Sequence, residues 1–293
     1  MDIDTLKAFI NVAEQGSFSR AAERLFITQP AVSKRIATLE SELETSLFDR
    51  VGHKILLTES GRALLPRARG ILLDVEDSKR AIANLADSIN GPVNIGTSHH
   101  IGLHRLPPVL REFTDGFPEV QLNIEFMDSE EACQAVLRGD IEVGIVTLPL
   151  SPDPELNLLP IWHDPLTLVA PNGHPLTKQK RFRIDQLADH NAILPATGTF
   201  TREVLEQTLR PLDIELQVSM STNYLETIKM LVSVGLGWSI LPRAMLDNEI
   251  CELKTSQIKM QRQLGVVTHT ERTLSNAADT LITTLIKCST TSA

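Results

Sequence analysis

Apolar residues in the first part of the chain recur every three or four positions, the spacing that one face of a helix requires. The pattern predicts a helix over residues 2–14, which Gly16 ends. A second, short helix is predicted from Ser19 to Leu25, with the Ser19 hydroxyl as its N-cap. The first helix is expected to bury one face through Leu6, Phe9, Ile10 and Ala13.

A third helix is predicted after a tight turn, because Thr28 can cap it and Pro30 falls in its first turn, where a missing N–H costs little. Residues 47–58 then predict a β-wing. A helix of this kind, with short polar side chains on one face, suits the major groove of DNA. Its core-facing positions are Val32, Ile36, Leu39 and Leu43. Another face carries the short side chains Gln29, Ser33, Lys34 and Ala37, and Arg35 can reach a phosphate.

The stretch from Glu59 to Ile89 changes to a seven-residue repeat of apolar positions, which is typical of helices that pair with one another. Packing of this helix on its own domain is the alternative, but no nearby segment obviously covers the repeat. Pro66 can kink its start, and Asn90-Gly91-Pro92 breaks it. The repeat runs through Leu64, Ala68, Ile71, Val75, Ser78, Ile82, Leu85 and Ile89.

Beyond residue 92 the pattern alternates between short strands and helices. This β-α-β rhythm predicts a mostly parallel sheet with right-handed crossovers. Strands are expected at residues 93–96, 120–126, 141–146, 166–170, 216–220 and 264–268, with another reached through 235–242. Helices are expected at residues 107–117, 129–137, 202–209, 224–234 and 274–287.

The net charge of −9 is unexpected for a protein that binds DNA. Charges act locally, however, within about one Debye length. Residues 17–36 contain four basic side chains and a single acidic one, Glu23. A small basic surface on an acidic body predicts modest non-specific affinity for DNA. The basic residues are Arg20, Arg24, Lys34 and Arg35.

No membrane association is predicted. No apolar run approaches the roughly 20 residues that span a bilayer, and the N-terminal residues lack the pattern of a signal peptide. We therefore expect a cytoplasmic protein. The cysteines are odd in number and widely spaced, so they predict no disulfide framework; they are Cys133, Cys251 and Cys288.

Histidines near residue 100 raise the question of a metal site. His100 and His104 are four residues apart and can share a helical face, and His99 and His163 are further candidate ligands. Structural zinc sites usually need a tighter group of four ligands. The sequence therefore predicts neither a metal nor a cofactor.

The order of residues around the predicted third helix resembles the N-terminal domain of the LysR-type transcriptional regulators. The shared motif is F-S-x-A-A-x-x-L-x-x-T-Q-P-A-V-S-x-x-I from Phe18, followed by L-F-x-R and L-T-x-x-G. The chain length and the downstream pattern fit the family as well. The resemblance implies an α/β effector domain of two Rossmann-like subdomains, similar to periplasmic binding proteins. An all-α winged helix-turn-helix domain and a long linker helix precede it.

The resemblance also implies boundaries and roles. The DNA-binding domain would span 1–58, the linker and dimerisation helix 59–90, and the effector-binding domain 91–293. Subdomain I of the effector-binding domain would comprise residues 91–162 and 268–293, and subdomain II residues 163–267. DNA contacts would come from Ser17, Thr28, Gln29, Pro30, Ser33, Lys34, Arg35, His53 and Lys54.

The tip of the wing departs from the family pattern. A basic residue at this tip commonly enters the minor groove in the family, and many members have arginine where this chain has His53. A histidine side chain is largely neutral at pH 7. Lys54 is the alternative for this contact.

Candidate effector contacts follow from the rule that ligands sit beyond the carboxyl ends of strands, beside helix N-termini. The loops that this rule selects are also where the family binds its ligands. Their hydroxyls and imidazoles suit a sulfur oxyanion or a small carboxylate, although the hydroxyls could simply cap helices. The strongest candidates are Ser98, His100, Thr147 and Thr199, followed by Thr97, His99, Ile101, Thr197 and Asn223.

The sequence therefore predicts a regulator that binds double-stranded promoter DNA, a small anionic effector and other copies of itself. Family precedent favours a homodimer that assembles further into a homotetramer. An enzyme or a carrier is the rival class, but the chain lacks a glycine-rich phosphate loop, a G-x-S-x-G elbow and an H-E-x-x-H motif. A constitutive DNA-binding protein with a vestigial cleft stays as the alternative.

Overall fold

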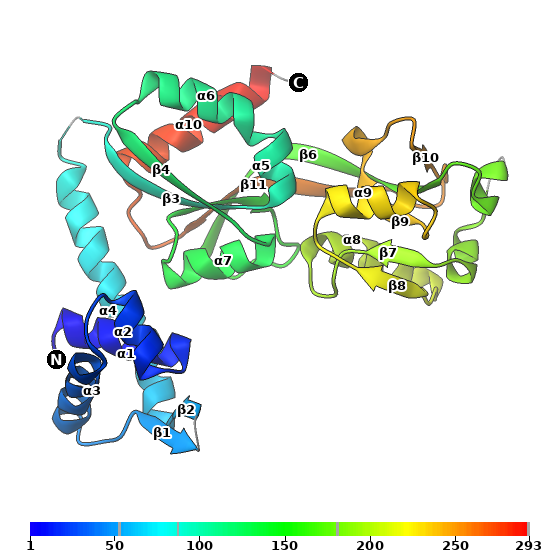
Figure 1. The fold of residues 1–293 in the computed structure, drawn as a ribbon. Helices are drawn as coiled ribbons and strands as arrows, with labels where there is room; N and C mark the ends of the chain where they lie inside the picture. Colours follow the sequence, from blue (N-terminus) through cyan, green and yellow to red (C-terminus); the bar gives the residue numbers. More distant parts are fainter. Residues whose placement is uncertain (52–53, 87, 180–181, 292–293) are drawn as a thin grey trace. The chain divides into compact units, whose positions relative to one another are not determined.

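The computed structural model describes residues 1–51, 54–86, 88–179 and 182–291. These residues divide into two compact units, Met1–Ala86 and Asp87–Ala293 (Figure 1). Each unit has hydrophobic clusters of its own, so each can be understood from its own sequence.

The first unit is a helix-turn-helix with a wing, as predicted. The Thr28 hydroxyl accepts a hydrogen bond from Ala31 N at 3.4 Å, and Pro30 lies in the first turn of the helix that follows. Gly16 ends the first helix in the left-handed region, at φ +57°. The elements are α1 (Ile3–Gln15), α2 (Phe18–Arg24), α3 (Gln29–Glu42) and the antiparallel pair β1 (Phe48–Val51) and β2 (Lys54–Leu57).

Three details of this unit correct the predictions. Ser17, and not Ser19, caps α2, because its hydroxyl accepts from Arg20 N and Phe18 is already helical while packing against Phe48. Leu43 is 39% exposed, since α3 ends at Glu42. Ala13 is half-buried, and Val12 takes a fully buried position on the core face of α1 instead.

The predicted linker helix is α4 (Glu59–Ala83), which runs through Pro66 without a break. It ends earlier than predicted, so Leu85 and Ile89 lie outside it. The start of the apolar repeat also packs within its own domain: Ala68 is fully buried, and Leu64 contacts the same cluster. What α4 leaves exposed is the later part of the repeat, where Ile71 is 37% and Ile82 is 70% exposed.

The second unit is built on a mixed sheet in which seven strands of the described residues pair in the order β10-β6-β11-β5-β3-β4, with β9 beside β6. A small parallel pair, β7 and β8, forms a separate sheet, which is bridged to the large one between Ala192 and Trp238, the residue before β9. The strands are β3 (Gly91–Thr97), β4 (Val120–Phe126), β5 (Val143–Thr147), β6 (Leu156–Pro171), β7 (Ala192–Leu194), β8 (Val218–Ser221), β9 (Ser239–Pro242), β10 (Ile250–Glu252) and β11 (Met260–His269).

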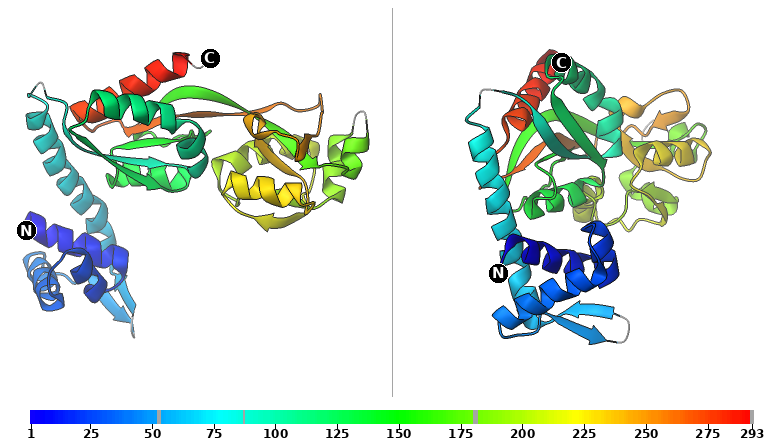
Figure 2. Two further views of the ribbon diagram at one scale, coloured as in Figure 1. Left: turned by 45° about the horizontal axis from the view of Figure 1, so that its top comes forward. Right: turned by 60° about the vertical axis from the view of Figure 1, so that its left-hand side comes forward.

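The prediction of a mostly parallel sheet was wrong. Strands β3, β4 and β5 pair in parallel, but β11 pairs antiparallel with both β5 and β6, and β6 pairs antiparallel with β9 and β10. The reason is that β6 begins at Leu156, ten residues before the predicted strand, and its residues 156–166 pair with the whole length of β11. Figure 2 shows these long strands passing through both halves of the unit.

The helices sort into two lobes around the shared strands β6 and β11 (Figure 1). We call lobe I the part formed by β3, β4, β5 and their helices, and lobe II the part formed by β7, β8, β9, β10 and theirs. Lobe I carries α5 (His99–His104), α6 (Leu106–Gly116), α7 (Ser129–Arg138) and α10 (Asn276–Thr291). Lobe II carries α8 (Phe200–Leu209) and α9 (Leu225–Ser233), with 3-10 turns at Pro175–Lys178, Ile184–Asp189, Arg210–Leu212 and Arg243–Met245.

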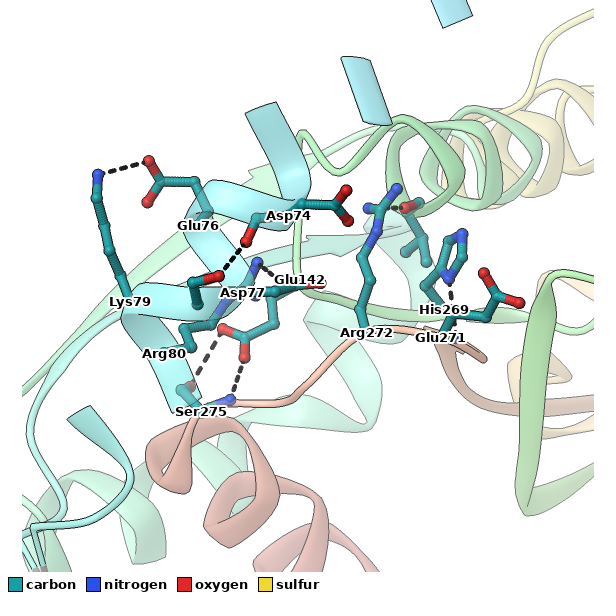
Figure 3. Close-up of polar contacts among 12 residues, drawn as sticks. Asp74, Glu76, Asp77, Lys79, Arg80, Glu142, His269, Glu271, Arg272 and Ser275 are labelled. Atoms are coloured by element: carbon teal, nitrogen blue, oxygen red, sulfur yellow. Dashed lines mark hydrogen bonds and ion pairs between the residues drawn. The ribbon is translucent and has the colours of Figure 1, made fainter. Parts of the chain in front are cut away.

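Polar contacts anchor the return of the chain from β11 to lobe I (Figure 3). The Glu142 carboxylate accepts hydrogen bonds from Ser275 N at 2.5 Å and from Ser275 Oγ at 3.2 Å, just before α10. Arg272 donates to the carbonyls of Val136 and Leu137 at 2.8 and 2.7 Å, at the end of α7. The end of the sequence is thereby tied to residues far earlier in the same lobe.

Candidate functional site

The N-terminal ends of α5, α7, α8 and α9 meet at one small pocket between the two lobes. Their N-cap residues Ser98, Asp128, Thr199 and Tyr224 all line it, and its volume is about 50 Å³. Helix N-termini present unpaired N–H groups and positive partial charge, which favours an anion. The other lining residues are His99, His100, Ser129, Glu130, Thr147, Pro195, Thr201, Asn223, Leu225 and Arg262.

The structure brings six of the nine predicted effector residues to this pocket: Ser98, His99, His100, Thr147, Thr199 and Asn223. The other three do not line it. Thr97 is buried and donates its hydroxyl to the Ile145 carbonyl at 2.7 Å, Ile101 belongs to the core of lobe I, and Thr197 is exposed. Thr97 is the last residue of β3, where successive side chains point to opposite faces of the sheet, so it faces the core while Ser98 lines the pocket.

Hydroxyl groups in the pocket differ in what they already bind. The Thr199 hydroxyl donates to the Ala196 carbonyl at 2.9 Å, and Ser129 accepts from Thr147 N at 3.1 Å. Among the described residues, the hydroxyls of Ser98 and Thr147 have no hydrogen-bond partner. These two side chains are therefore ready to donate to a ligand.

Arg262 supplies a fixed positive charge to the pocket from β11. It donates to the Asp164 carboxylate at 2.8 Å and to the Thr201 hydroxyl at 2.7 Å. Both members of the Arg262–Asp164 pair are buried, and Arg105 lies 3.6 Å from the other Asp164 oxygen. Burial lowers the pKa of Arg262, while Asp164 opposes that shift. The pair holds the guanidinium against the pocket wall.

Two carboxylates of lobe I cross the pocket to lobe II. Glu130 accepts a hydrogen bond from Phe200 N in the first turn of α8, and Asp128 accepts one from Asn223 Nδ2 at 2.5 Å. Burial raises the pKa of Glu130 above its ordinary value. The site that favours an anion thus already contains carboxylates of the protein itself.

The histidines of α5 point in different directions. The His99 ring lies between Phe126 and Tyr224, with ring centroids 5.0 and 4.7 Å away. His100 Nδ1 lies 3.3 Å from Glu226 Oε1, and His104 Nε2 lies 3.0 Å from the same oxygen. Hydrogen bonding, from His100 first, lowers the pKa of Glu226 to about 2.

In the first unit, one face of α3 is open to solvent. Thr28, Gln29 and Pro30 are exposed, and Gln29 Nε2 donates to Ser33 Oγ at 2.9 Å. Phe26, in the turn before α3, is 96% exposed and has φ +54°, which is unusual for a bulky residue. Phe26 was not among the predicted DNA contacts, although the sequence already placed it in the turn between the second and third helices.

The basic residues of this unit are not all available to DNA in the same way. Arg35 pairs with Asp4 at 2.9 Å, Arg24 pairs with Glu14 at 3.3 Å, and Arg20 donates to the Gln15 carbonyl. Lys34 is exposed and has no ion-pair partner among the described residues. His53 lies outside the described residues, and Lys54 begins β2. Ser17 is engaged as the cap of α2.

Each of the two units matches a known protein family. Residues 3–62 match the family "Bacterial regulatory helix-turn-helix protein, lysR family", and residues 86–287 match "LysR substrate binding domain". The chain belongs to the LysR family of transcriptional regulators. It is 31% identical over 290 residues, 94% of each chain, to a probable RuBisCO transcriptional regulator of Trieres chinensis.

Two solved structures share the fold over nearly the whole chain. A full-length OxyR variant from Pseudomonas aeruginosa has a TM-score of 0.71 at 22% identity, covering 99% of this chain and 94% of that one. CbnR in complex with its target DNA has a TM-score of 0.62 at 23% identity, covering 99% and 100%. The predicted fold class of a winged helix-turn-helix, a linker helix and a periplasmic-binding-protein-like domain is confirmed.

This LysR-type protein is a DNA-binding transcriptional regulator and not an enzyme. No helix among the described residues is long and apolar enough to cross a membrane.

The sequence reasoning missed several pocket residues of this regulator. Arg262 lies between two glutamines and two residues before the strand predicted at residues 264–268, so the local pattern did not mark it as buried. Glu130 and Asp128 stand at the start of a predicted helix, where acidic residues are ordinary, so nothing in the sequence set them apart. Thr201 is the last residue of the predicted ligand loop at residues 196–201, and Tyr224 directly follows the predicted contact Asn223.

Proposed function

We propose that a small anion, a sulfur oxyanion or a small carboxylate, binds in the pocket between the lobes and modulates promoter binding by this regulator. The observation that carries the proposal is the meeting of helix N-termini, the Arg262 guanidinium and the free Ser98 and Thr147 hydroxyls around one small space. A larger apolar ligand would need a roomier pocket, since such sites usually hold about 300 Å³ or more.

We further propose that Glu130 occupies part of this site when no effector is bound. Its carboxylate already accepts the Phe200 amide in the first turn of α8, as an effector oxygen would. An effector anion must therefore displace or repel Glu130, and that movement would change how lobe I meets lobe II. The effector would then make contacts in one arrangement of the lobes that it cannot make in the other, and a ligand can shift a conformational equilibrium only through such a difference.

Sulfate is the cleanest probe, because its charge is constant between pH 5 and 8. We expect Ser98→Ala and Thr147→Val each to weaken its binding several-fold, since each removes a hydroxyl donor. Glu130→Gln should strengthen binding by removing a like charge. In the wild type, affinity should rise as the pH falls toward the raised pKa of Glu130, and the rise should be smaller in Glu130→Gln, where only other groups such as the lining His99 and His100 can contribute to it. Isothermal titration calorimetry measures all of these.

Thr197→Val is the matched control, because Thr197 is exposed and lies outside the pocket. Equal affinities in all variants would place the anion elsewhere. If no anion in a panel of sulfur oxyanions and small carboxylates raises the melting temperature of the wild type, the vestigial-cleft alternative holds, because a specific ligand stabilises by mass action.

For the DNA, we propose that α3 reads bases and that Thr28, Pro30, Lys34 and Arg35, with Ser17 and the wing residues His53 and Lys54, position the domain on the backbone and in the minor groove. Residues 1–58 would form the DNA-binding domain, 59–90 the dimerising linker and 91–293 the effector-binding domain. We propose a homodimer or a homotetramer as the assembled form, on the basis of the apolar positions that α4 leaves exposed.

Gln29→Ala and Ser33→Ala should each weaken binding to the target promoter by about 1–3 kcal/mol, because bidentate or paired base contacts are worth that much. Lys34→Ala should weaken binding to all sequences alike and reduce the salt slope by about one. Fluorescence anisotropy with specific and scrambled duplexes at several salt concentrations separates these effects.

Ser41→Ala, about two turns further along α3, is the control and should bind as the wild type does. An unchanged ratio of specific to non-specific affinity in the Gln29 and Ser33 variants would remove α3 as the recognition helix.

A further inference from the structure

Three side chains of the types that can ligate metals gather at the junction of the lobes: His100, His104 and Glu226. His100 and His104 lie one turn apart on α5, and Glu226 faces both from the first turn of α9. The ligand atoms of the three residues all lie within 4.8 Å of one another. His100 is nearly buried, while half of the His104 side chain and about a third of Glu226 stay exposed.

We propose that His100, His104 and Glu226 form a site for a divalent transition metal such as Zn²⁺. Nitrogen and oxygen ligands at tetrahedral zinc, bound at about 2.0–2.1 Å, stand roughly 3.4 Å apart. The two histidine-to-glutamate separations of 3.3 and 3.0 Å are already close to that spacing. The sequence predicted no metal because the neighbouring histidines do not form the tight group of four ligands that structural zinc sites usually need. Glu226 lies 126 and 122 residues from His100 and His104, so the sequence did not connect it with them.

The surroundings leave room for a fourth ligand. His100, His104 and Glu226 line one end of a broad groove that also includes Met230, Ser233 and Met245. A three-ligand site with an open position is a common arrangement for zinc, in which water or another small ligand completes the coordination. The nearby Lys229 pairs with Asp247, so its charge is partly neutralised where it faces the groove.

A metal here would join the two lobes, since two ligands come from lobe I and one from lobe II. His100 also lines the effector pocket, as does Ser98 at the start of α5, and Asn223 and Tyr224 precede α9. Binding a metal would hold α5 and α9 together and thereby fix both walls of that pocket. The metal site does not depend on the effector being an anion.

The test uses the full-length protein after removal of metals with a chelator. Co²⁺ titration should produce the visible absorption of tetrahedral cobalt with nitrogen and oxygen ligands, and Zn²⁺ should abolish it at one equivalent per chain. His104→Ala and Glu226→Gln should lower Zn²⁺ affinity at least about 10-fold in competition with a chromogenic chelator. His163→Ala, at an exposed histidine of β6, is the matched control and should bind as the wild type does.

Circular dichroism of each variant confirms that it is folded; His104→Ala removes a half-exposed ring and should not disturb the core. The proposal fails if the wild type binds Zn²⁺ no more tightly than His104→Ala does. It also fails if Co²⁺ gives only the weak absorption of octahedral, largely hydrated ions, because the three residues would then merely hydrogen-bond to one another.

Discussion

Asp164→Ala is expected to destabilise the effector-binding unit by about 3–5 kcal/mol, because it leaves a buried guanidinium without its partner. Asp164 is 1% exposed and Arg262 5%, and their side chains are joined by a 2.8 Å hydrogen bond. Arg105, 3.6 Å from the same carboxylate, would also lose its counter-charge. Among the charged pairs of the described residues, this one combines the deepest burial with a second cation, so its loss should have the largest effect on stability.

Differential scanning calorimetry is the appropriate measurement, because a chain of two units need not unfold in one step. The transition of the effector-binding unit should fall by roughly 6–20 °C. Asp140→Ala breaks the exposed pair with Arg138 and should cost less than about 1 kcal/mol. Replacing both partners, in Asp164→Leu with Arg262→Met, should recover much of the loss. A melting temperature of Asp164→Ala equal to that of Asp140→Ala would contradict the assigned role of the pair.

Ile82→Glu is expected to break the proposed dimer. Ile82 is 70% exposed and Ile71 is 37% exposed on α4, and Val75 lies between them in the same repeat. An apolar seam formed by two copies of this helix would bring the two introduced carboxylates near one another and bury them without partners, which costs several kcal/mol. The folding of each unit should be unaffected, since Ile82 packs against neither core cluster.

Light scattering across a concentration series measures the mass of the assembly. Ala83→Glu introduces the same charge at the next position, which points away from the repeat, and should leave the mass unchanged. If Ile82→Glu and the wild type have the same mass at every concentration, α4 does not form the dimer interface. The exposed apolar residues of α4 would then need another partner.

The elements built from local signals could be predicted closely from the sequence. The cap at Thr28, the proline in the first turn of α3 and the wing were all foreseen, and the strand predicted at residues 120–126 matches β4. The predicted apolar repeat lies on α4 as far as Ile82, but only the tertiary structure showed that Leu64 and Ala68 at its start pack in the core of the helix's own domain. An apolar repeat shows that one face of a helix is apolar, but it does not show which partner covers that face.

The strand directions in the sheet and the charged residues of the pocket depended on contacts between distant parts of the chain. The long pairing of β6 with β11 decided that the sheet is mixed, although the local β-α-β rhythm favoured a parallel one. The charge of the pocket depends on Arg262 meeting Asp164 and on Glu130 meeting the start of α8, pairs separated by 98 and 70 residues. The sequence by itself determined the family, the helix-turn-helix and most of the loops that surround the pocket, because caps, turns and periodicity act over a few residues. Only the tertiary structure decided which side chains face one another there, because strand register and the meeting of the two lobes depend on the whole chain.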